Sequence, residues 1–309
     1  LSDIPMDRNC TYDFVLLASN TYGNPNGDPD NGNEPRTNPF TRQGMITDVC
    51  TKRKVRDYVL MQAEADPEKY IKDRIFIQSD EALNAKLTNA YTELGLKLGK
   101  EGTVKKDVDT AKAYMLDNYF DVRMFGAVMN TGKNRADIVT GAVAIPFAVS
   151  VDPVNLVYNS LTRKAQTLEE KADQTGSTFA NKTVVEFGLY KATCRYNAHQ
   201  GIRNGVTADD LALLFDALTN MYNYDLSAAR GLMKTQKLVI FKHPNANAVG
   251  AAEDYSNLIK VTRTNTEDEF PHSMEDYEIT IDTERVPSGV EVYDLSLIHI
   301  SEPTRHSLI

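Results

Sequence analysis

The chain has 309 residues, of which 41% are hydrophobic, and it carries a formal net charge of −9. This length allows a full hydrophobic core in one large or two modest domains. No window approaches the roughly 18 uncharged apolar residues of a transmembrane helix, and the first residues lack the basic-then-apolar pattern of a secretory signal. We expect no disulfide framework, no zinc site and a reducing cytoplasm, because the cysteines are few and far apart: Cys10, Cys50 and Cys194.

The charge is unevenly distributed along the chain. Segment 267–294 contains ten acidic residues and one basic residue, Arg285, so it alone accounts for the net −9. The remainder is balanced, and segment 36–56 carries six basic residues against the single acid Asp48. The local field, not the total charge, governs what binds to a surface. The acidic total therefore does not exclude a nucleic-acid partner.

The last segment is set aside. "LSLIHISEPTR", residues 295–305, reads as the in-frame translation of a common transposon-type sequencing adapter. We interpret residues 295–309 as a non-native adapter scar and exclude them from the fold prediction, as expression tails are excluded. His299 and His306 are excluded with them.

The first half of the chain predicts strand, loop, helix and strand. Residues 11–18 are β-rich and apolar, as in a buried strand, and the Gly/Asn/Pro stretch 23–36 is a loop. Residues 46–65 form a helix with a Thr-Asp pair at its start, where either side chain suits an N-cap. Residues 74–79 are a second strand candidate, and 80–120 are helical in composition, as in an inserted element.

The second half repeats the pattern. Residues 142–151 are strand-like, and the polar stretch 152–185 reads as a long projecting hairpin or arm. Residues 184–198 alternate as a strand does, 207–225 form the clearest helix, and 237–243 form a closing strand.

Helix 207–225 has both a start signal and a buried face. Thr207 and Asp210 form a capping-box pattern, and one apolar stripe follows the helix: Leu211, Leu214, Phe215, Leu218 and Tyr222. Two halves, each with one helix packed on a sheet, predict an α+β fold. We expect a ferredoxin-like (RRM-like) palm that carries two insertions.

The loop 23–36, "GNPNGDPDNGNEPR", fails as a calcium site. Starting an EF-hand register at Asp28 places Gly32 at the fifth position and Pro39 at the twelfth, and starting at Asn26 fails similarly. Two interpretations stay open: a turn-rich loop, which Asn, Gly, Pro and Asp all favour, or a cradle whose backbone N–H groups approach phosphates. Arg36 at its end would add a phosphate contact.

The helix that follows the loop carries the second basic signal. At 100° per residue, Lys52, Arg53 and Arg56 fall within an arc of roughly 100° on one face, whereas Lys54 points elsewhere. A solvated face is the ordinary interpretation. The expected proximity to the loop favours one shared anionic ligand.

Other motifs are weaker. "GAVMNTGKN", residues 126–134, has five residues between its glycines, and Asn134 replaces the Ser/Thr of a P-loop, so we reject nucleotide hydrolysis. Lys133 and Arg135 still suit a phosphate backbone. The remaining histidines, His199, His243 and His272, have no metal-ligand spacing. Phe187, Tyr190 and Tyr196 alternate on a strand, where we favour core packing over base stacking.

The ordered motifs carry a resemblance. "YDFVLL…GNPNGDPDNGNEPR", "ITDVCTKRKVRDYV", "DVRMFGAVMNTGKN", "FGLYKA" and "YDLSAARGLMKTQKLVIFKH" closely resemble the backbone subunit of the CRISPR type I-C Cascade effector, the seventh Cas family in its Csd-type form, within the RRM-like RAMP superfamily. The resemblance spans about residues 7–294. Two departures are Ala18-Ser19-Asn20 after the first strand, and Thr140 and Val149 where relatives often carry arginines.

The resemblance implies an architecture. It divides the chain into a discontinuous palm at 7–79 and 121–266, a helical finger at 80–120, a thumb hairpin at 155–183 and an acidic C-terminal segment at 267–294. Copies of such a subunit polymerise along a CRISPR RNA and leave its bases free for the target strand.

The resemblance also implies contacts and partners. Because the spacer of the guide varies, we expect the protein to hold phosphates and 2′-hydroxyls in place of base edges. The expected partners are the guide RNA, further copies of the chain, the guide-processing endonuclease subunit, the large PAM-recognising subunit, the small subunit and the target DNA strand. The expected contact residues are Asn26 and Gly27 by backbone amides, and Arg36, Lys52, Arg53, Arg56, Lys133, Arg163 and Arg230 by side chain.

Three functions remain under consideration. The first is a non-catalytic, cytoplasmic, guide-binding subunit in a prokaryote, with no metal or other cofactor. The second is a metal-dependent ribonuclease like the related type III backbone proteins, for which Asp28 or Asp30 would hold the metal; paired aspartates in a turn more often cap backbone. The third is a stand-alone RRM-like binder, which leaves the long insertions without a purpose.

Overall fold

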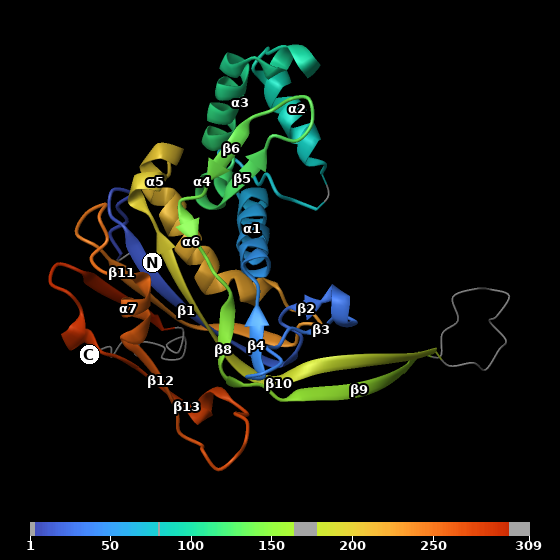
Figure 1. Cartoon of the computed structure of the whole chain (residues 1–309), viewed down its shortest axis with the longest axis vertical. Coiled ribbons are helices and arrows are strands. Elements are labelled where there is room, and N and C mark those ends of the chain that lie inside the picture. The colour runs from blue at the N-terminus through green and yellow to red at the C-terminus, as the bar shows by residue number, and fades with distance from the viewer. Residues whose placement is uncertain (1–3, 80, 164–177, 297–309) are drawn as a thin grey trace, which may run out of the picture.

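A computed structural model describes residues 4–79, 81–163 and 178–296, and its largest element is an antiparallel sheet with the order β14-β11-β1-β10-β8-β4 (Figure 1). Strands β7 and β9 also pair with β10. The strands are β1 Tyr12–Gly23, β2 Gly27–Asp28, β3 Glu34–Pro35, β4 Gln43–Ile46, β5 Gly126–Met129, β6 Asp137–Thr140, β7 Val143–Ala144, β8 Ala148–Pro153, β9 Leu156–Arg163, β10 Thr178–Tyr196, β11 Leu232–Lys242, β12 Ile259–Arg263, β13 Tyr277–Ile281 and β14 Glu291–Ser296. The helices are α1 Asp48–Ala65, α2 Leu83–Glu93, α3 Lys105–Asn118, α4 Phe120–Phe125, α5 Ala198–Asn204, α6 Ala208–Asn220 and α7 Ala252–Asn257.

The four central strands have the ferredoxin-like topology. Strand β1 leads to α1, strand β10 leads to α6, and the spatial order β11-β1-β10-β8 is 4-1-3-2 when these strands are numbered along the chain. This confirms the expected α+β, RRM-like palm. No helix of the described residues is both long and apolar enough to cross a membrane.

Helices α1 and α6 pack on one face of the sheet. Phe14 of β1 meets Phe215 of α6 edge to face, with ring centroids 5.3 Å apart. The expected stripe of α6 is buried in this cluster, and the capping box is present: Thr207 accepts from the Asp210 amide at 3.1 Å and its own amide donates to the Asp210 carboxylate at 2.8 Å. Thr47, not Asp48, caps α1.

The C-terminal part of the chain covers the opposite face. Val15 and Leu17 of β1 lie in a second cluster with residues of α7, β12 and β13. Strand β14 extends the sheet edge, where Leu238 pairs with Leu295 and Lys237 with Ser296. Two residues of the segment set aside as a scar therefore belong to the fold, and residues 297–309 lie outside the described part.

The helical insertion has a hydrophobic core of its own. Helices α2 and α3 pack with α4 and the β5–β6 hairpin, and this core includes Phe76, Tyr91 and Met115. It also includes Met129 and Val139, which lie beyond the expected finger boundary at residue 120. Figure 1 shows this element standing at the far end of α1 from β4.

The prediction of a strand at 74–79 is wrong. Only Arg74 makes a bridge, to Tyr119, and the amides of Phe76 and Ile77 donate to the Asp121 carboxylate at 2.7 and 3.0 Å. The second strand of the palm is β8, which follows the insertion. The apolar pattern at 74–79 arises because this segment packs into the insertion's core.

Strands β9 and β10 leave the sheet together as a two-stranded arm. Their register runs from Leu156↔Val185 to Arg163↔Thr178. Strand β10 is 19 residues long, so one strand serves both the sheet and the arm. Figure 1 shows the arm projecting away from the body on the side where β2 and β3 lie. The expected hairpin centre, 164–177, lies outside the described residues.

Candidate nucleic-acid interface

The loop 23–36 is a small hairpin. Strands β2 and β3 pair Gly27 with Pro35 and Asp28 with Glu34. A 3₁₀ turn, Pro29–Asn31, joins the strands, and Asp28 accepts from the Asp30 amide at 3.3 Å. Asp28 therefore caps the turn, as paired aspartates commonly do. A Cβ on Gly27 would lie 2.1 Å from Asn33 Oδ1, so a larger residue here would displace the Asn33 side chain.

The hairpin is fixed to the start of α1. The Thr47 amide donates to Asn26 Oδ1 at 2.9 Å, and the Arg36 amide donates to the Asn26 carbonyl at 3.1 Å. The Met45 amide donates to the Arg36 carbonyl at 2.8 Å. The expectation that the loop and the basic helix are neighbours is confirmed.

Arg36 points its charge to the surface of this hairpin. Its side chain is 30% exposed and pairs with Asp28 at 3.3 Å. Its Nε is buried and has no hydrogen-bond partner among the described residues. A buried donor without a partner is uncommon; the part of Arg36 that a ligand can reach is the exposed part of its side chain.

The basic residues of α1 do not form one exposed face. Arg56 is 7% exposed; its Nε donates to Asp121 at 2.8 Å, and its guanidinium lies 5.4 Å from the Phe125 ring centroid. The insertion therefore covers Arg56, which is not on the exposed face expected for an RNA contact. Lys52 pairs with Asp48 at 2.9 Å and is 21% exposed, whereas Arg53 is 56% exposed.

A third segment, the turn before β11, lies against the hairpin. The Asn24 amide donates to the Ala229 carbonyl at 2.9 Å, and Asn20 Nδ2 donates to the Arg230 carbonyl at 2.7 Å. The Arg230 side chain, 35% exposed, pairs with Asp225 at 3.1 Å. Arg230 and Arg36 thus lie on segments that contact one hairpin.

The arm joins this group through Lys182. Its Nζ donates to the Ala228 carbonyl, and Thr183 donates to Glu34 of the hairpin at 3.1 Å. The sequence did not point to Lys182, because a single lysine in a polar strand forms no motif. The hairpin, the Arg230 turn and the base of the arm together form what we call the hairpin surface.

Two expected contacts lie elsewhere. Lys133 is exposed in the β5–β6 turn of the insertion, and that antiparallel hairpin is not the strand-to-helix loop of a nucleotide-binding site. Arg163 is the last described residue of β9, at the outer part of the arm. The structure does not bring either one to the hairpin surface.

The three aromatic residues of β10 and His243 are structural, whereas His199 and His272 are exposed. Phe187, Tyr190 and Tyr196 are at most 2% exposed, which confirms core packing. His243 is fully buried, accepts from the Val249 amide at 3.0 Å and lies 2.8 Å from the Asp13 carboxylate. Burial raises the pKa of Asp13, but hydrogen bonds from His243 and Arg195 outweigh burial and hold the pKa below its ordinary value. No group of three or more metal-binding side chains exists within 4–79, 81–163 and 178–296.

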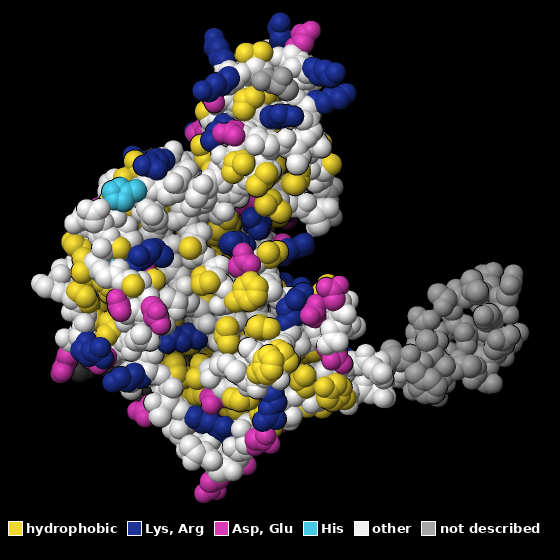
Figure 2. All heavy atoms as spheres, in the orientation of Figure 1, with side chains coloured by type: hydrophobic (Ala, Val, Ile, Leu, Met, Phe, Trp, Pro, Cys, Tyr) yellow, Lys and Arg dark blue, Asp and Glu magenta, His cyan; other side chains and the backbone are white. Residues whose placement is uncertain are grey.

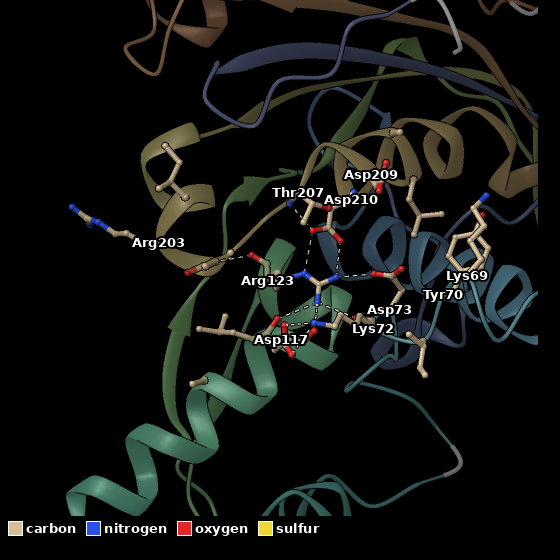
Figure 3. A pocket seen from close by; sticks show the side chains of 18 of the residues that line it. Lys69, Tyr70, Lys72, Asp73, Asp117, Arg123, Arg203, Thr207, Asp209 and Asp210 are labelled. Atoms are coloured by element: carbon tan, nitrogen blue, oxygen red, sulfur yellow. Dashed lines mark hydrogen bonds and ion pairs between the residues drawn. The ribbon is translucent and has the colours of Figure 1, made fainter. Parts of the chain in front are cut away.

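A cavity of about 800 Å³ lies beyond the other end of α1 (Figure 3). Arg123 at its wall donates to Asp210 at 2.6 Å, to Asp73 at 2.7 Å and to three backbone carbonyls. Burial, together with the Asp210 charge, raises the pKa of Asp73 to about 6. Helix α1 has 18 residues, so about 27 Å of helix separates this cavity from the hairpin surface.

The sequence and the fold were compared with those of known proteins. No curated protein matches the sequence. Two similar solved chains are titled "CRISPR RNA-guided surveillance complex, pre-nicking" and "CRISPR RNA-guided surveillance complex". The first is 14% identical, covers 78% of this chain and 80% of its own, and has a TM-score of 0.48; the second is 14% identical, with 78% and 72% coverage and a TM-score of 0.43. The sequence matches the family model described as "CRISPR-associated protein Cas7" over residues 10–282, and the chain therefore belongs to this family.

Proposed function

We propose that the chain is a CRISPR RNA-binding backbone subunit of a type I-C Cascade surveillance complex. In this role it polymerises along the guide, holds the sugar-phosphate backbone without reading sequence, and presents bases for pairing with target DNA in antiviral defence. Family membership and the sequence motifs of the type I-C form support the proposal.

The observation that carries the proposal is the hairpin surface. Three separate segments meet there, and Arg36 and Arg230 keep about a third of each side chain exposed. Each pairs with one aspartate at 3.3 and 3.1 Å. Ion pairs this exposed contribute at most about 1 kcal/mol, so phosphate oxygens can replace the aspartates. Figure 2 shows the surface hollowed between the helical insertion and the base of the arm, with Lys and Arg side chains along the hollow.

The architecture follows as part of the proposal. The palm is 7–79 and 121–266, the finger is 80–120 and the thumb is 155–183, with 267–294 as an acidic C-terminal segment. The insertion's core supports moving the end of the finger to about Thr140. The proposed partners are the guide, further copies of the chain, the other Cascade subunits and the target strand, in the prokaryotic cytoplasm.

We propose a non-catalytic role over a ribonuclease role. Asp28 Oδ1 already accepts a backbone amide and pairs with Arg36, which is the role of an aspartate that caps a turn. Target RNA incubated with the assembled complex and magnesium should stay intact. Regular cleavage that disappears in Asp30→Ala would establish the ribonuclease instead.

The first experiment is purification of the full chain from cells that express a guide. The proposal predicts strong absorbance at 260 nm and a discrete RNA band of guide length. Protein free of RNA, which also fails to bind added guide, would contradict it.

A second experiment tests backbone recognition. The Arg36→Ala, Arg230→Ala double variant should weaken binding equally for unrelated spacers and reduce the slope of log affinity against log salt by about 0.7 per lost phosphate contact. Lys97→Ala is the matched control, because Lys97 is 72% exposed and lies in the insertion. Loss confined to one spacer would contradict backbone recognition.

A further inference from the structure

Tyr22, the residue before the hairpin, has a left-handed backbone with φ +46°. Within the described residues, Asn33, Arg42 and Asp137 are the other non-glycine residues with positive φ. Asn and Asp tolerate this region, whereas a bulky side chain in it is a genuine outlier. Such a conformation persists only where the surrounding structure imposes it.

The surrounding backbone fixes Tyr22. A Cβ on the next residue, Gly23, would lie 1.7 Å from the Arg230 carbonyl oxygen. A Cβ on Gly231 would lie 2.5 Å from the Tyr22 carbonyl oxygen. The end of β1 is therefore pressed against the Arg230 turn, with no room for a different path, and the direction of the Tyr22 side chain is set by this packing.

The ring that this backbone holds is exposed. Tyr22 is 60% exposed, and within the part of the chain that the structure describes its side chain makes no hydrogen bond, ring contact or cation contact. Leu232, which is 64% exposed, pairs with the preceding Thr21. Tyr22 thus has an unfavourable backbone conformation, and no contact of its own side chain compensates for it.

The segments around Tyr22 carry basic residues. Arg230 lies on the turn that its backbone touches, Lys182 binds the same turn, and Arg36 closes the hairpin that begins at the next residue. An aromatic ring beside cations that hold phosphates is the arrangement by which proteins bind single-stranded nucleic acid, since every base offers a face for stacking.

We propose that Tyr22 stacks on one nucleobase of the bound RNA, next to phosphates held by Arg36 and Arg230. The inference rests on the proposed function and adds a base contact to it. Stacking does not depend on base identity, so it agrees with binding of guides of any sequence.

The chain contains no tryptophan, so Tyr22→Trp supplies a single fluorescent reporter. Its emission should be quenched by saturating single-stranded RNA and much less by an abasic RNA of the same length, which keeps the phosphates. Val128→Trp is the control, because Val128 is 62% exposed on β5 of the insertion; its emission should not respond to either RNA.

Affinity and stability provide independent measurements. Tyr22→Ala should weaken RNA binding by about 5- to 100-fold, the effect of removing one stacked base, while Tyr22→Phe should bind as the original does. Tyr22→Gly should raise the melting temperature, because glycine relieves the left-handed backbone, and still weaken RNA binding. A purely structural tyrosine would lower the melting temperature when removed.

Three results would overturn the inference. Equal quenching by the abasic and the intact RNA would show that no base reaches the ring, and unchanged affinity in Tyr22→Ala would show that stacking contributes nothing. Quenching that follows protein concentration without RNA would assign Tyr22 to a contact between copies. In each case RNA binding by the original chain would leave the proposed function standing, whereas its absence would remove both.

Discussion

Two arginines near opposite ends of α1 differ in how fully their charges are paired. Arg123 lies beyond the C-terminal end of the helix, and Arg36 lies at its N-terminal end. Arg123 is 5% exposed and bonds two carboxylates and three carbonyls. Arg36 is 30% exposed, pairs with one aspartate at 3.3 Å and leaves its Nε without a partner among the described residues. A saturated cation stabilises the fold, and an unsaturated one is available to a ligand. The number of basic residues in a segment does not distinguish these two roles.

The largest expected effect is on stability, at the C-terminal end. Arg123→Met leaves the buried carboxylate of Asp210 and the partly buried carboxylate of Asp73 without their cation. We expect a loss of about 3–5 kcal/mol in the free energy of unfolding, measured by chemical denaturation. A loss below about 1 kcal/mol would show that Arg123 is not saturated as described.

Arg56 and Arg53 form a matched pair on one helix. Arg56→Met removes the partner of Asp121, which is 1% exposed, and should destabilise the fold by about 3 kcal/mol. Arg53→Ala removes an exposed pair with Asp57 and should change stability by less than about 0.5 kcal/mol. The reverse order in denaturation experiments would contradict the burial of Arg56 under the insertion.

A smaller effect than that of either buried arginine is a pH dependence at the cavity. The pKa of Asp73 is about 6 in the fold and about 3.9 in an unfolded chain. Protonation therefore stabilises the fold: this contribution is complete below pH about 4 and is lost as pH rises through about 6.

Asp73→Asn tests this contribution, because the amide stays neutral at every pH. The unfolding free energy of the original chain, relative to this variant, should fall by about 1–2 kcal/mol between pH 5 and pH 7.5. Chemical denaturation at several pH values measures the difference. Parallel pH curves for the two proteins would contradict a raised pKa at Asp73.

Local signals in the sequence predicted the elements whose causes are local. The capping box at Thr207 and the apolar stripe predicted α6. The turn residues predicted a turn-rich loop at 23–36, but not the pairing of β2 with β3. The ferredoxin-like topology was also expected, since two strand-helix-strand halves allow few arrangements, but its second strand is β8 and not residues 74–79.

Long-range contacts were not predictable. Residues 74–79 contain the short apolar run of a strand, but the carboxylate of Asp121, more than 40 positions away in the chain, takes the amides that a strand would pair. A helical wheel places Arg56 beside Lys52, yet the insertion that covers Arg56 depends on tertiary packing. The backbone of Tyr22 depends on the Arg230 turn, about 200 residues later, and no pattern near Tyr22 signals it.

Photo-crosslinking of the protein–RNA complex, with the modified peptides identified by mass spectrometry, tests the central claim most directly. The account predicts adducts in peptides of the hairpin surface, which contain Tyr22, Lys182 and Arg230, for guides of unrelated sequence. Adducts concentrated on the cavity residues Lys69, Lys72 and Arg203, with none at the hairpin surface, would contradict it.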